Sequence, residues 1–480
     1  MPIRSLAASL RRPLGLLPLS ALLCCALTAC GGGDGKPAPN ATQALTADTT
    51  YGTQGQATLL LSAPGEPKAG ISAAQLQPDG KLLLAGWREL PPPMDQGAGS
   101  PFNRLPMQAV VWRLHADGSL DTSFGNGGHI ALHLRSHTTM THLRWTADGI
   151  LLALTLAEPC TPVALGFCID ATGTPTYPQA ALVRLKADGT LDTGFGSAGI
   201  ASVPYGWPSA LAVQPDGRIL WLNSASHPRG GIWRWNLQRY TPSGAVDASF
   251  NQGQPRASQC ESNAAALALL PDGRILAGGD RRAHLASPTH SPGVCLEALL
   301  PDGQRDPSFA NGQPLWLHAG ANTDLQTLDV NRNGHITLTT RLLDGAQTCS
   351  FGISRLTASG ALDKSFGDGG ATRLPMTSKA TGKDHFCALD ATLHTADGHT
   401  VLAGRRWAQG HTPDASVWAR LTPEGQPDGA FAPAGMHTSP GFAPRYLLQE
   451  TSGRWLAIRT HLGADGSVQA HITRLQGEAG

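Results

Sequence analysis

The chain has 480 residues, and its 36 Lys and Arg residues almost balance its 35 Asp and Glu residues, which leaves a net charge of +1. This balance argues against electrostatic capture of nucleic acid, because phosphate binding depends on clustered positive charge. The hydrophobic fraction of 41% is ordinary for a folded globule, and the 57 Gly and 36 Pro residues indicate many turns.

The first 29 residues are predicted to be a signal peptide. Three arginines precede an apolar stretch, residues 14–27, that is shorter than a membrane-spanning helix requires. The stretch leads into Leu-Thr-Ala-Cys, ending at Cys30, which resembles the lipobox of bacterial lipoproteins. By this resemblance Cys30 is the first residue of the mature protein and carries several acyl chains, which make a stable anchor. The alternative is an ordinary signal peptide with a chance cysteine.

The residues after Cys30 predict a location and a tether. Gly31 favours the outer membrane of the cell envelope by the same resemblance, with the protein on its periplasmic or its surface face. Residues 30–45 are rich in Gly, Pro, Ala and Thr, so they are predicted to form a flexible tether that buries no core. Residues 46–480 are predicted to be one domain, and no further stretch is long and apolar enough to predict a membrane-spanning helix.

This domain repeats one phrase seven times, with a period of about 62 residues. Each copy contains an apolar run, a turn that ends in Gly, and a second apolar run, as in residues 76–86. Asp-Gly and Asn-Gly between apolar runs are the strongest signal for an antiparallel hairpin, because both residues tolerate positive φ. The turn glycines are Gly80, Gly149, Gly217, Gly273, Gly334, Gly398 and Gly453.

A second phrase follows each of the first six hairpins. Its first copy runs from Val111 to Gly125 and contains Arg113, Asp121 and Phe124. A Gly-rich corner and another apolar stretch follow the Phe. Each period therefore predicts four strands, which is the size of one β-propeller blade.

The two ends of the domain complete each other. The C-terminal copy stops after Arg474 and Leu475 and lacks the Asp, the aromatic corner and a fourth strand. Residues 48–52 and the apolar run 57–61 supply those parts. We therefore predict an all-β fold, a single seven-bladed β-propeller of four-stranded antiparallel blades. Its ring is closed by an N-terminal strand that completes the C-terminal blade and removes an exposed edge. A register with the N-terminal strand innermost in its own blade also gives seven blades, but without this closure.

The repeated phrases carry a family resemblance. Gln-Pro-Asp-Gly-Lys at residues 77–81 and the Arg-Leu to Ser-Phe-Gly phrase at residues 113–125 resemble the delta-60 repeat β-propeller family. The order of the parts is also similar to the shorter NHL repeat. The resemblance covers about residues 46–476 and is looser in the last three copies. It implies a propeller with a surface or secreted location, and it implies no defined biochemical activity.

The recurring arginine and aspartate are predicted to form a structural bridge at the corner between the third and fourth strands. Repetition argues for structure, because one active site needs a single copy. In the fourth copy Asp306 and Phe309 are present, but Ala298 takes the place of the arginine. The predicted pairs are Arg113–Asp121, Arg184–Asp192, Arg239–Asp247, Arg355–Asp363, Arg420–Asp428 and, across the closure, Arg474–Asp48.

Six cysteines after residue 45 are candidates for disulfides, since an even number is typical of exported proteins. Cys160 and Cys168 bracket one loop and are predicted to pair. Sequence does not fix the connectivity of the others. The two further predicted pairs are Cys260–Cys295 and Cys349–Cys387. A metal site is not predicted from these cysteines, because Cys-x-x-Cys does not occur outside the signal peptide.

No catalytic or cofactor motif is found, so we predict no catalytic residue, no cofactor and no metal. Two histidines of the densest group, His129 and His133, share a strand face but are about 13 Å apart, too far for one metal. The other two are His137 and His142. Gly-rich segments such as residues 125–128 lie at strand corners rather than before helices, so phosphate binding is not expected.

Three hypotheses for function remain open, because a fold does not determine a function. The leading one is a lipid-anchored, non-enzymatic binding or scaffold protein of the cell envelope. It would bind an unknown protein, small molecule or glycan on the face that carries the variable loops 88–106, 158–178 and 281–292. We expect a monomer, attached to the membrane through the lipid on Cys30 and without a nucleic-acid partner.

The two alternatives make different demands on the chain. The first is a propeller hydrolase or lyase with a metal at one end of the channel. It would need several inward Asp, Glu or His side chains, for which the candidates are His142, Asp329, Asp390 and His394. The second is a structural component of an envelope assembly.

Overall fold

The computed structural model describes residues 45–91, 106–135, 137–157, 161–163, 167–169, 175–176, 179–203, 207–225, 234–281, 293–317, 322–343, 349–376, 386–407, 415–439 and 443–477. The chain divides into two compact units, Met1–Ala38 and Pro39–Gly480, and every described residue belongs to the second. Regular structure in these ranges is β-strand apart from short 3-10 helices. None of the helices there has the length and hydropathy of a membrane span.

Five sheets of the second unit have four strands each, joined antiparallel. Four of them follow chain order from the inner to the outer strand. The first two contain β13(Trp207–Val213), β14(Ile219–Ala225), β15(Arg234–Tyr240) and β16(Arg256–Ala257), and then β17(Ala266–Leu269), β18(Ile275–Arg281), β19(Gly293–Leu299) and β20(Leu315–Leu317). The next two contain β21(Asn322–Val330), β22(Ile336–Leu343), β23(Cys349–Leu356) and β24(Ala371–Pro375), and then β25(Phe386–His394), β26(Thr400–Trp407), β27(Ala415–Leu421) and β28(Met436–Ser439). The fifth contains β29(Tyr446–Gln449), β30(Trp455–Leu462), β31(Val468–Leu475) and β1(Gln56–Ser62).

The remaining long strands form one eight-stranded sheet. One antiparallel group is β2(Ala69–Leu76), β3(Leu82–Glu89), β4(Met107–Leu114) and β5(His129–Leu132), and the other is β6(His137–Thr146), β7(Gly149–Ala157), β11(Gln179–Leu185) and β12(Ile200–Val203). Strands β4 and β6 join the two groups through a parallel pair, Met107 with His137.

The prediction of seven separate four-stranded blades is therefore wrong. The propeller has five separate four-stranded blades, and strands β2 to β7 with β11 and β12 form the continuous eight-stranded sheet. The physical reason is the Met107–His137 pair, through which backbone hydrogen bonding continues from one group to the next. In addition, β8(Thr161–Val163), β9(Phe167–Ile169) and β10(Pro175–Thr176) form a small sheet of their own within one of the variable loops.

The turn glycines explain why the repeated phrase forms hairpins. All seven have positive φ, from 78° at Gly334 to 128° at Gly149, a region that glycine adopts without steric cost. At the first turn, the amide of Gly80 donates to the carbonyl of Gln77 (3.0 Å). Each turn therefore reverses the chain between the first two strands of its group, as the sequence predicts.

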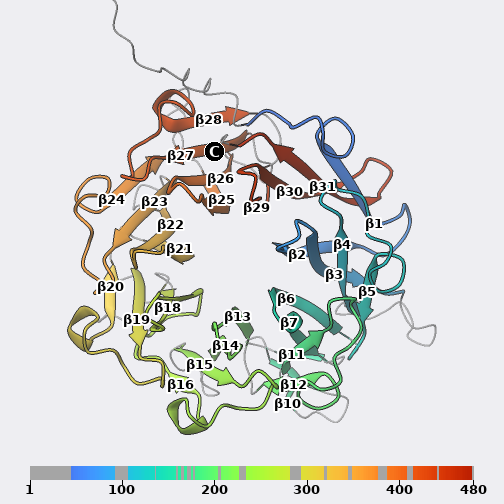
Figure 1. Cartoon of the computed structure of the whole chain (residues 1–480), viewed down its shortest axis with the longest axis horizontal. Helices are drawn as coiled ribbons and strands as arrows, with labels where there is room; N and C mark the ends of the chain where they lie inside the picture. Colours follow the sequence, from blue (N-terminus) through green and yellow to red (C-terminus); the bar gives the residue numbers. More distant parts are fainter. Residues whose placement is uncertain are drawn as a thin grey trace, which may run out of the picture. The chain divides into compact units, whose positions relative to one another are not determined.

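The hydrophobic core lies between neighbouring sheets. The first strands of the groups contact one another in the order β2, β6, β13, β17, β21, β25 and β29, and β29 contacts β2 again. Figure 1 shows these strands around the centre of the ring. Between two sheets, Leu151 and Ala153 of β7 pack with Leu211 of β13 and Trp221 of β14. Alternate side chains thus bury each sheet against a neighbour on either face.

The ring closes as the sequence predicts, by the addition of β1 to the C-terminal sheet. β1 pairs antiparallel with β31, from Gln56 with Thr473 to Leu60 with Gln469. The Asp48 amide donates to the Arg474 carbonyl at 2.8 Å, and the Asp48 carboxylate accepts a hydrogen bond from Nε of Arg474 at 3.0 Å. Figure 1 shows β1 beside β31 at the outer rim. Backbone and side-chain bonds therefore fasten the same point.

Replacing Asp48 should loosen this closure. The carboxylate is nearly buried and also contacts Arg454 Nε at 2.8 Å, so Asp48→Ala leaves two arginines without their shared partner. We expect a loss of about 3 kcal/mol and a fall in melting temperature of about 3 °C, measured by circular dichroism. The control is Asp465→Ala, whose carboxylate accepts the Ser467 amide within its own turn. Equal melting of the two variants would show that the Asp48 clasp does not stabilise the ring.

Candidate functional site

The corners between third and fourth strands bring the predicted arginines and aspartates together. Nε of Arg113 lies 2.8 Å from Oδ2 of Asp121, and both side chains are buried. The same two atoms are 2.6–2.7 Å apart in the pairs Arg184–Asp192, Arg239–Asp247, Arg355–Asp363 and Arg420–Asp428. The Arg113 guanidinium also lies 4.5 Å from the centre of the Phe124 ring, a favourable cation–π contact. Each corner is thus a packed unit of three side chains.

Four of these arginines, Arg113, Arg184, Arg239 and Arg355, also reach the next group of strands along the chain. Nη1 of Arg113 donates to the carbonyl of Ala187 at 2.6 Å, and Nη1 of Arg184 donates to that of Pro242 at 2.7 Å. Both acceptors lie in the turn after the third strand of the next group. This contact could not be predicted from the sequence, because a backbone acceptor leaves no side-chain pattern. One guanidinium therefore fixes its own corner and the distance to the next group of strands.

A second cation approaches the corner aspartate from the residue after the turn glycine. Nζ of Lys81 lies 3.2 Å from Oδ2 of Asp121, and Nε of Arg218 lies 3.0 Å from Oδ2 of Asp247. These cations come from the hairpin turn of the same sheet. They add to the corner arginine and do not replace it.

The corner that contains Ala298 uses this second cation alone. Nη1 of Arg274 lies 2.7 Å from Oδ2 of Asp306 and also donates to the carbonyl of Ala358 in the next sheet, at 3.1 Å. Arg274 therefore makes both contacts that the missing arginine makes elsewhere. In the sequence, the sign that Arg274 can take the place of the missing corner arginine is its position directly after the turn glycine, Gly273.

The hydrogen bonds at the corners stabilise the ionised carboxylates. Bonds from Ser365, supported by Arg355, lower the pKa of Asp363 to about 2. The hydroxyl of Thr50 likewise lowers the pKa of Asp48. An unfolded aspartate has a pKa of about 3.9, so the corners stabilise the fold above that pH. The contribution is lost as the pH falls through the lower pKa values of the folded protein.

Two of the predicted disulfides are present, and each joins segments from different hairpins. Cys260 precedes β17 and bonds to Cys295 in β19, with Cα atoms 5.9 Å apart. Cys349 in β23 bonds to Cys387 in β25 of the next sheet, with Cα atoms 5.8 Å apart. Each disulfide closes a loop in the unfolded chain, and the resulting loss of chain entropy stabilises the folded state by about 4 kcal/mol. Cys30, Cys160 and the side chain of Cys168 lie outside the described residues.

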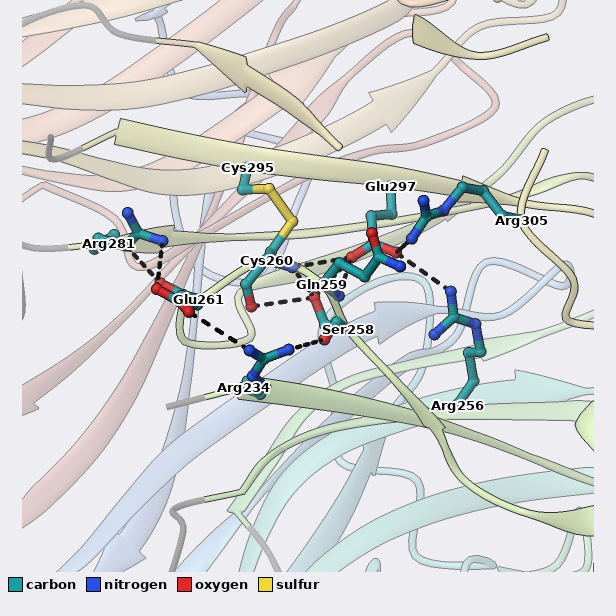
Figure 2. The surroundings of a disulfide bond; sticks show 10 residues. All are labelled: Arg234, Arg256, Ser258, Gln259, Cys260, Glu261, Arg281, Cys295, Glu297 and Arg305. Carbon is teal, nitrogen blue, oxygen red and sulfur yellow. Dashed lines mark hydrogen bonds and ion pairs between the residues drawn. A yellow bond between two sulfur atoms is a disulfide. The ribbon is translucent and has the colours of Figure 1, made fainter. Parts of the chain in front are cut away.

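The Cys260–Cys295 disulfide adjoins a buried carboxylate (Figure 2). Glu297 accepts hydrogen bonds from the Ser258 hydroxyl at 2.8 Å and from the amides of Gln259 at 2.6 Å and Cys260 at 3.1 Å. Figure 2 shows Arg256 and Arg305 approaching its second oxygen, at 3.7 Å and 3.9 Å. Because only 1% of the Glu297 side chain is exposed, this group fixes the segment that carries Cys260 and is closed to a ligand.

Two cavities lie along the inner strands. The larger, of about 320 Å³, is lined by residues of β6, β13, β17 and β21, and its charged members are Arg144 and Asp329. The smaller, of about 210 Å³, is lined by residues of β21, β25 and β29 together with the charged Asp390 and Arg445. Asp390 is already bound by Arg405, with Oδ1–Nη2 and Oδ2–Nε distances of 2.6 Å and 2.7 Å. In the larger cavity, by contrast, neither Arg144 nor Asp329 forms an ion pair with an Arg, Lys, Asp or Glu side chain among the described residues.

The inward groups predicted for an enzyme do not converge. Asp329 and His394 meet, with Oδ2 3.9 Å from Nε2, whereas Asp390 belongs to the Arg405 pair. His142 faces the interior of the protein, where burial lowers its pKa to about 4. In the part of the chain that the structure describes, no three His, Cys, Asp or Glu side chains are placed to hold a metal ion.

Comparison with protein families agrees with the architecture. A family model described as "Domain of unknown function (DUF5122) beta-propeller" matches residues 108–124, 169–195 and 214–250. These ranges cover the corners of Arg113, Arg184 and Arg239. The chain is a β-propeller protein. No curated protein matches its sequence.

Solved structures resemble this propeller only distantly. A protein of unknown function from Dyadobacter fermentans is 11% identical, with a TM-score of 0.42 over 88% of this chain and 100% of its own. An ulvan lyase, a polysaccharide lyase, is 10% identical, with a TM-score of 0.42 over 91% and 96%. An α-L-arabinanase from Penicillium chrysogenum is 11% identical, with a TM-score of 0.39 over 76% and 98%. At these values the similarities carry no argument about function.

The loops that sequence analysis favoured as a binding face of the propeller lie largely outside the described residues. Of the loop 281–292, only Arg281 is described, and its guanidinium lies 4.3 Å from the centre of the Trp316 ring. Of the predicted histidine group, His129 begins β5 and His137 begins β6. The inner strands and their cavities are therefore the described part of the propeller that offers a site.

The corner with one cation gives a matched test of the role of the arginines. Arg274→Ala removes the cation from buried Asp306, whereas Arg218→Ala leaves Asp247 with Arg239. We expect Arg274→Ala to destabilise the propeller by about 3 kcal/mol and Arg218→Ala by less than about 1 kcal/mol, measured by thermal melting.

The decisive control for this prediction is the double variant Arg274→Ala/Ala298→Arg, which restores an arginine at the position used by the other corners. It should recover most of the lost melting temperature. If Arg274→Ala and Arg218→Ala melt at the same temperature, the second cation does not take over the role of the corner arginine.

Proposed function

We propose that this propeller is a lipid-tethered, non-enzymatic binding protein of the bacterial cell envelope. The observation that supports binding is the cavity of about 320 Å³, where Arg144 and Asp329 line the same space as apolar side chains of β13 and β17. Small-molecule sites combine an apolar wall with a few polar groups in this way. The arginine corners hold the sheets around the cavity, so a ligand would meet a preformed site at a low ordering cost.

The finer family assignment is also part of this proposal. We infer membership of the delta-60 repeat family. The support is the recurring Gln-Pro-Asp-Gly phrase, the six arginine–aspartate corners, and the match to a propeller family model over three separate ranges. The variable loops remain a second surface for a protein or glycan partner.

The proposed location rests on the N-terminal sequence. The apolar residues 14–27 followed by Cys30 support export and lipidation, and Gly31 supports the outer membrane. Two disulfides in the described residues agree with an oxidising compartment. A lipid on Cys30 would keep the propeller at the membrane while residues 30–45 give it reach.

Cys30→Ala tests the tether. The wild-type protein, expressed in a bacterium, should sediment with the membranes and incorporate an alkyne-labelled fatty acid, because several acyl chains bind a bilayer stably. The variant should lose the label and move to the soluble fraction. Ala29→Ser, a small-for-small exchange beside the cysteine, serves as the control. A labelled or membrane-bound Cys30→Ala variant would refute lipidation at this residue.

A thermal-shift panel tests the binding role with the detergent-purified full-length protein. The panel contains sugars, sugar acids, amino acids and peptidoglycan fragments. A true ligand at a hundred times its Kd adds about 2.7 kcal/mol of stability, which raises the melting temperature by about 3 °C. If no class in the panel shifts the melting temperature, and none is chemically altered on incubation, a small-molecule binding role is refuted.

A further inference from the structure

The two charged residues that line the larger cavity, Arg144 and Asp329, occupy the same position of the repeat. It lies five residues before the turn glycine, on the inner strand. Its occupants in chain order are Gln75, Arg144, Ala212, Ala268, Asp329, Leu393 and Leu448. The fold accepts small, apolar or amide side chains at five of these positions. The charges of Arg144 and Asp329 are therefore not required by the repeat, and both line the same cavity.

Arg144 lies in this cavity without a carboxylate partner among the described residues. Its Nη1 donates to the carbonyl of the adjacent Leu143 at 2.9 Å. The cavity wall beside it is formed by Leu211, Ala212 and Val213. The Arg144 side chain is exposed, so a ligand in the cavity can reach the guanidinium. A bound carboxylate would give this arginine the charged partner that the described residues do not supply.

Asp329 supplies the opposite charge from another wall. It belongs to β21, which is separated from the β6 strand of Arg144 by β13 and β17 in the order of contacting strands. Half of its side chain is exposed (51%), and its Oδ2 lies 3.9 Å from Nε2 of His394. That distance exceeds a hydrogen bond. Oδ1 of Asp329 accepts the amide of Val330 at 2.7 Å, and Oδ2 keeps its capacity to accept a hydrogen bond from a ligand. The small side chains of Ala212 and Ala268 leave the space between the two walls open.

We propose that this cavity binds a small hydroxylated carboxylate of the sugar-acid class, with its carboxylate on Arg144 and a hydroxyl donated to Asp329. The planar guanidinium binds a carboxylate through two parallel hydrogen bonds. Leu269 and Val330 offer an apolar surface for the C–H face of the molecule. A volume of about 320 Å³ is at the small end of ligand sites, which fits a monosaccharide. This inference rests on the proposed binding function and names its ligand.

Other small ligands fit the two charges less well. A neutral sugar leaves Arg144 unpaired, and a dicarboxylate or phosphate brings excess negative charge toward Asp329. An α-amino acid carries its ammonium beside its carboxylate, so a carboxylate bound to Arg144 would place that ammonium next to the guanidinium, and like charges repel. A sugar acid carries hydroxyls along the carbons away from its carboxylate and brings no second charge into the cavity.

The test is isothermal titration of the detergent-purified full-length protein with sodium D-glucuronate, and with D-glucose at the same ionic strength. We expect glucuronate to bind and glucose not to bind. Arg144→Gln should weaken glucuronate binding by at least about tenfold, because it removes a charge-assisted pair, and Asp329→Asn should weaken it less. The matched control is Arg445→Gln, which removes an exposed arginine from the smaller cavity and should leave the affinity unchanged.

The melting temperature of Arg144→Gln gives an independent readout. If the guanidinium is held ready for a ligand, its removal should leave the ligand-free melting temperature equal or higher. A lower value would assign Arg144 a structural role and overturn the proposal. Equal glucuronate affinity in wild type and Arg144→Gln, or no binding to the wild type up to about 10 mM, would also overturn it. A shift caused by another class in the thermal panel would then leave the general binding function standing.

Discussion

The guanidinium of the corner arginine is the group on which the ring depends. It contacts the aspartate of its own corner, an aromatic ring and a backbone carbonyl of the next group of strands, as Arg113 does with Asp121, Phe124 and Ala187. A single sheet here has two apolar faces, so it is stable only between two neighbours. The arginine sets that spacing at the rim while apolar side chains fill the interior to close packing. The same rule holds at Ala298, where another arginine restores the geometry.

The repeats in the sequence predicted much of this architecture. The hairpins, the arginine–aspartate contacts and the closure through residues 57–61 each involve side chains at a fixed spacing, so a pattern search finds them. The number of separate blades did not follow, because the union of β4 and β6 depends on one backbone pair, Met107 with His137. Backbone pairing between repeats leaves no mark on residue types. The contacts from arginine to carbonyl escaped prediction for the same reason.

The candidate site was predicted in part. Asp329 and His394 were expected to face inward, and their side chains do approach each other. Arg144 was not identified, because its own strand, residues 137–146, contains several other polar residues. It stands out only when the same position is compared across all copies and when the structure shows that the cavity also contains Asp329. The Cys260–Cys295 and Cys349–Cys387 pairs were found because cysteine has few other roles in an exported chain.

The closure also determines how the ring would respond to a pull on its N-terminal end. The amide of Gln476 donates to the carbonyl of Thr46 at 2.9 Å, and Ala47 pairs with Leu475, just before the Asp48 clasp. A force that arrives along the chain from residue 45 loads these few bonds first. The closure between residues 46–48 and 474–476 would therefore break first under tension. The ring would open at this one place while the remaining sheets keep their own strands paired.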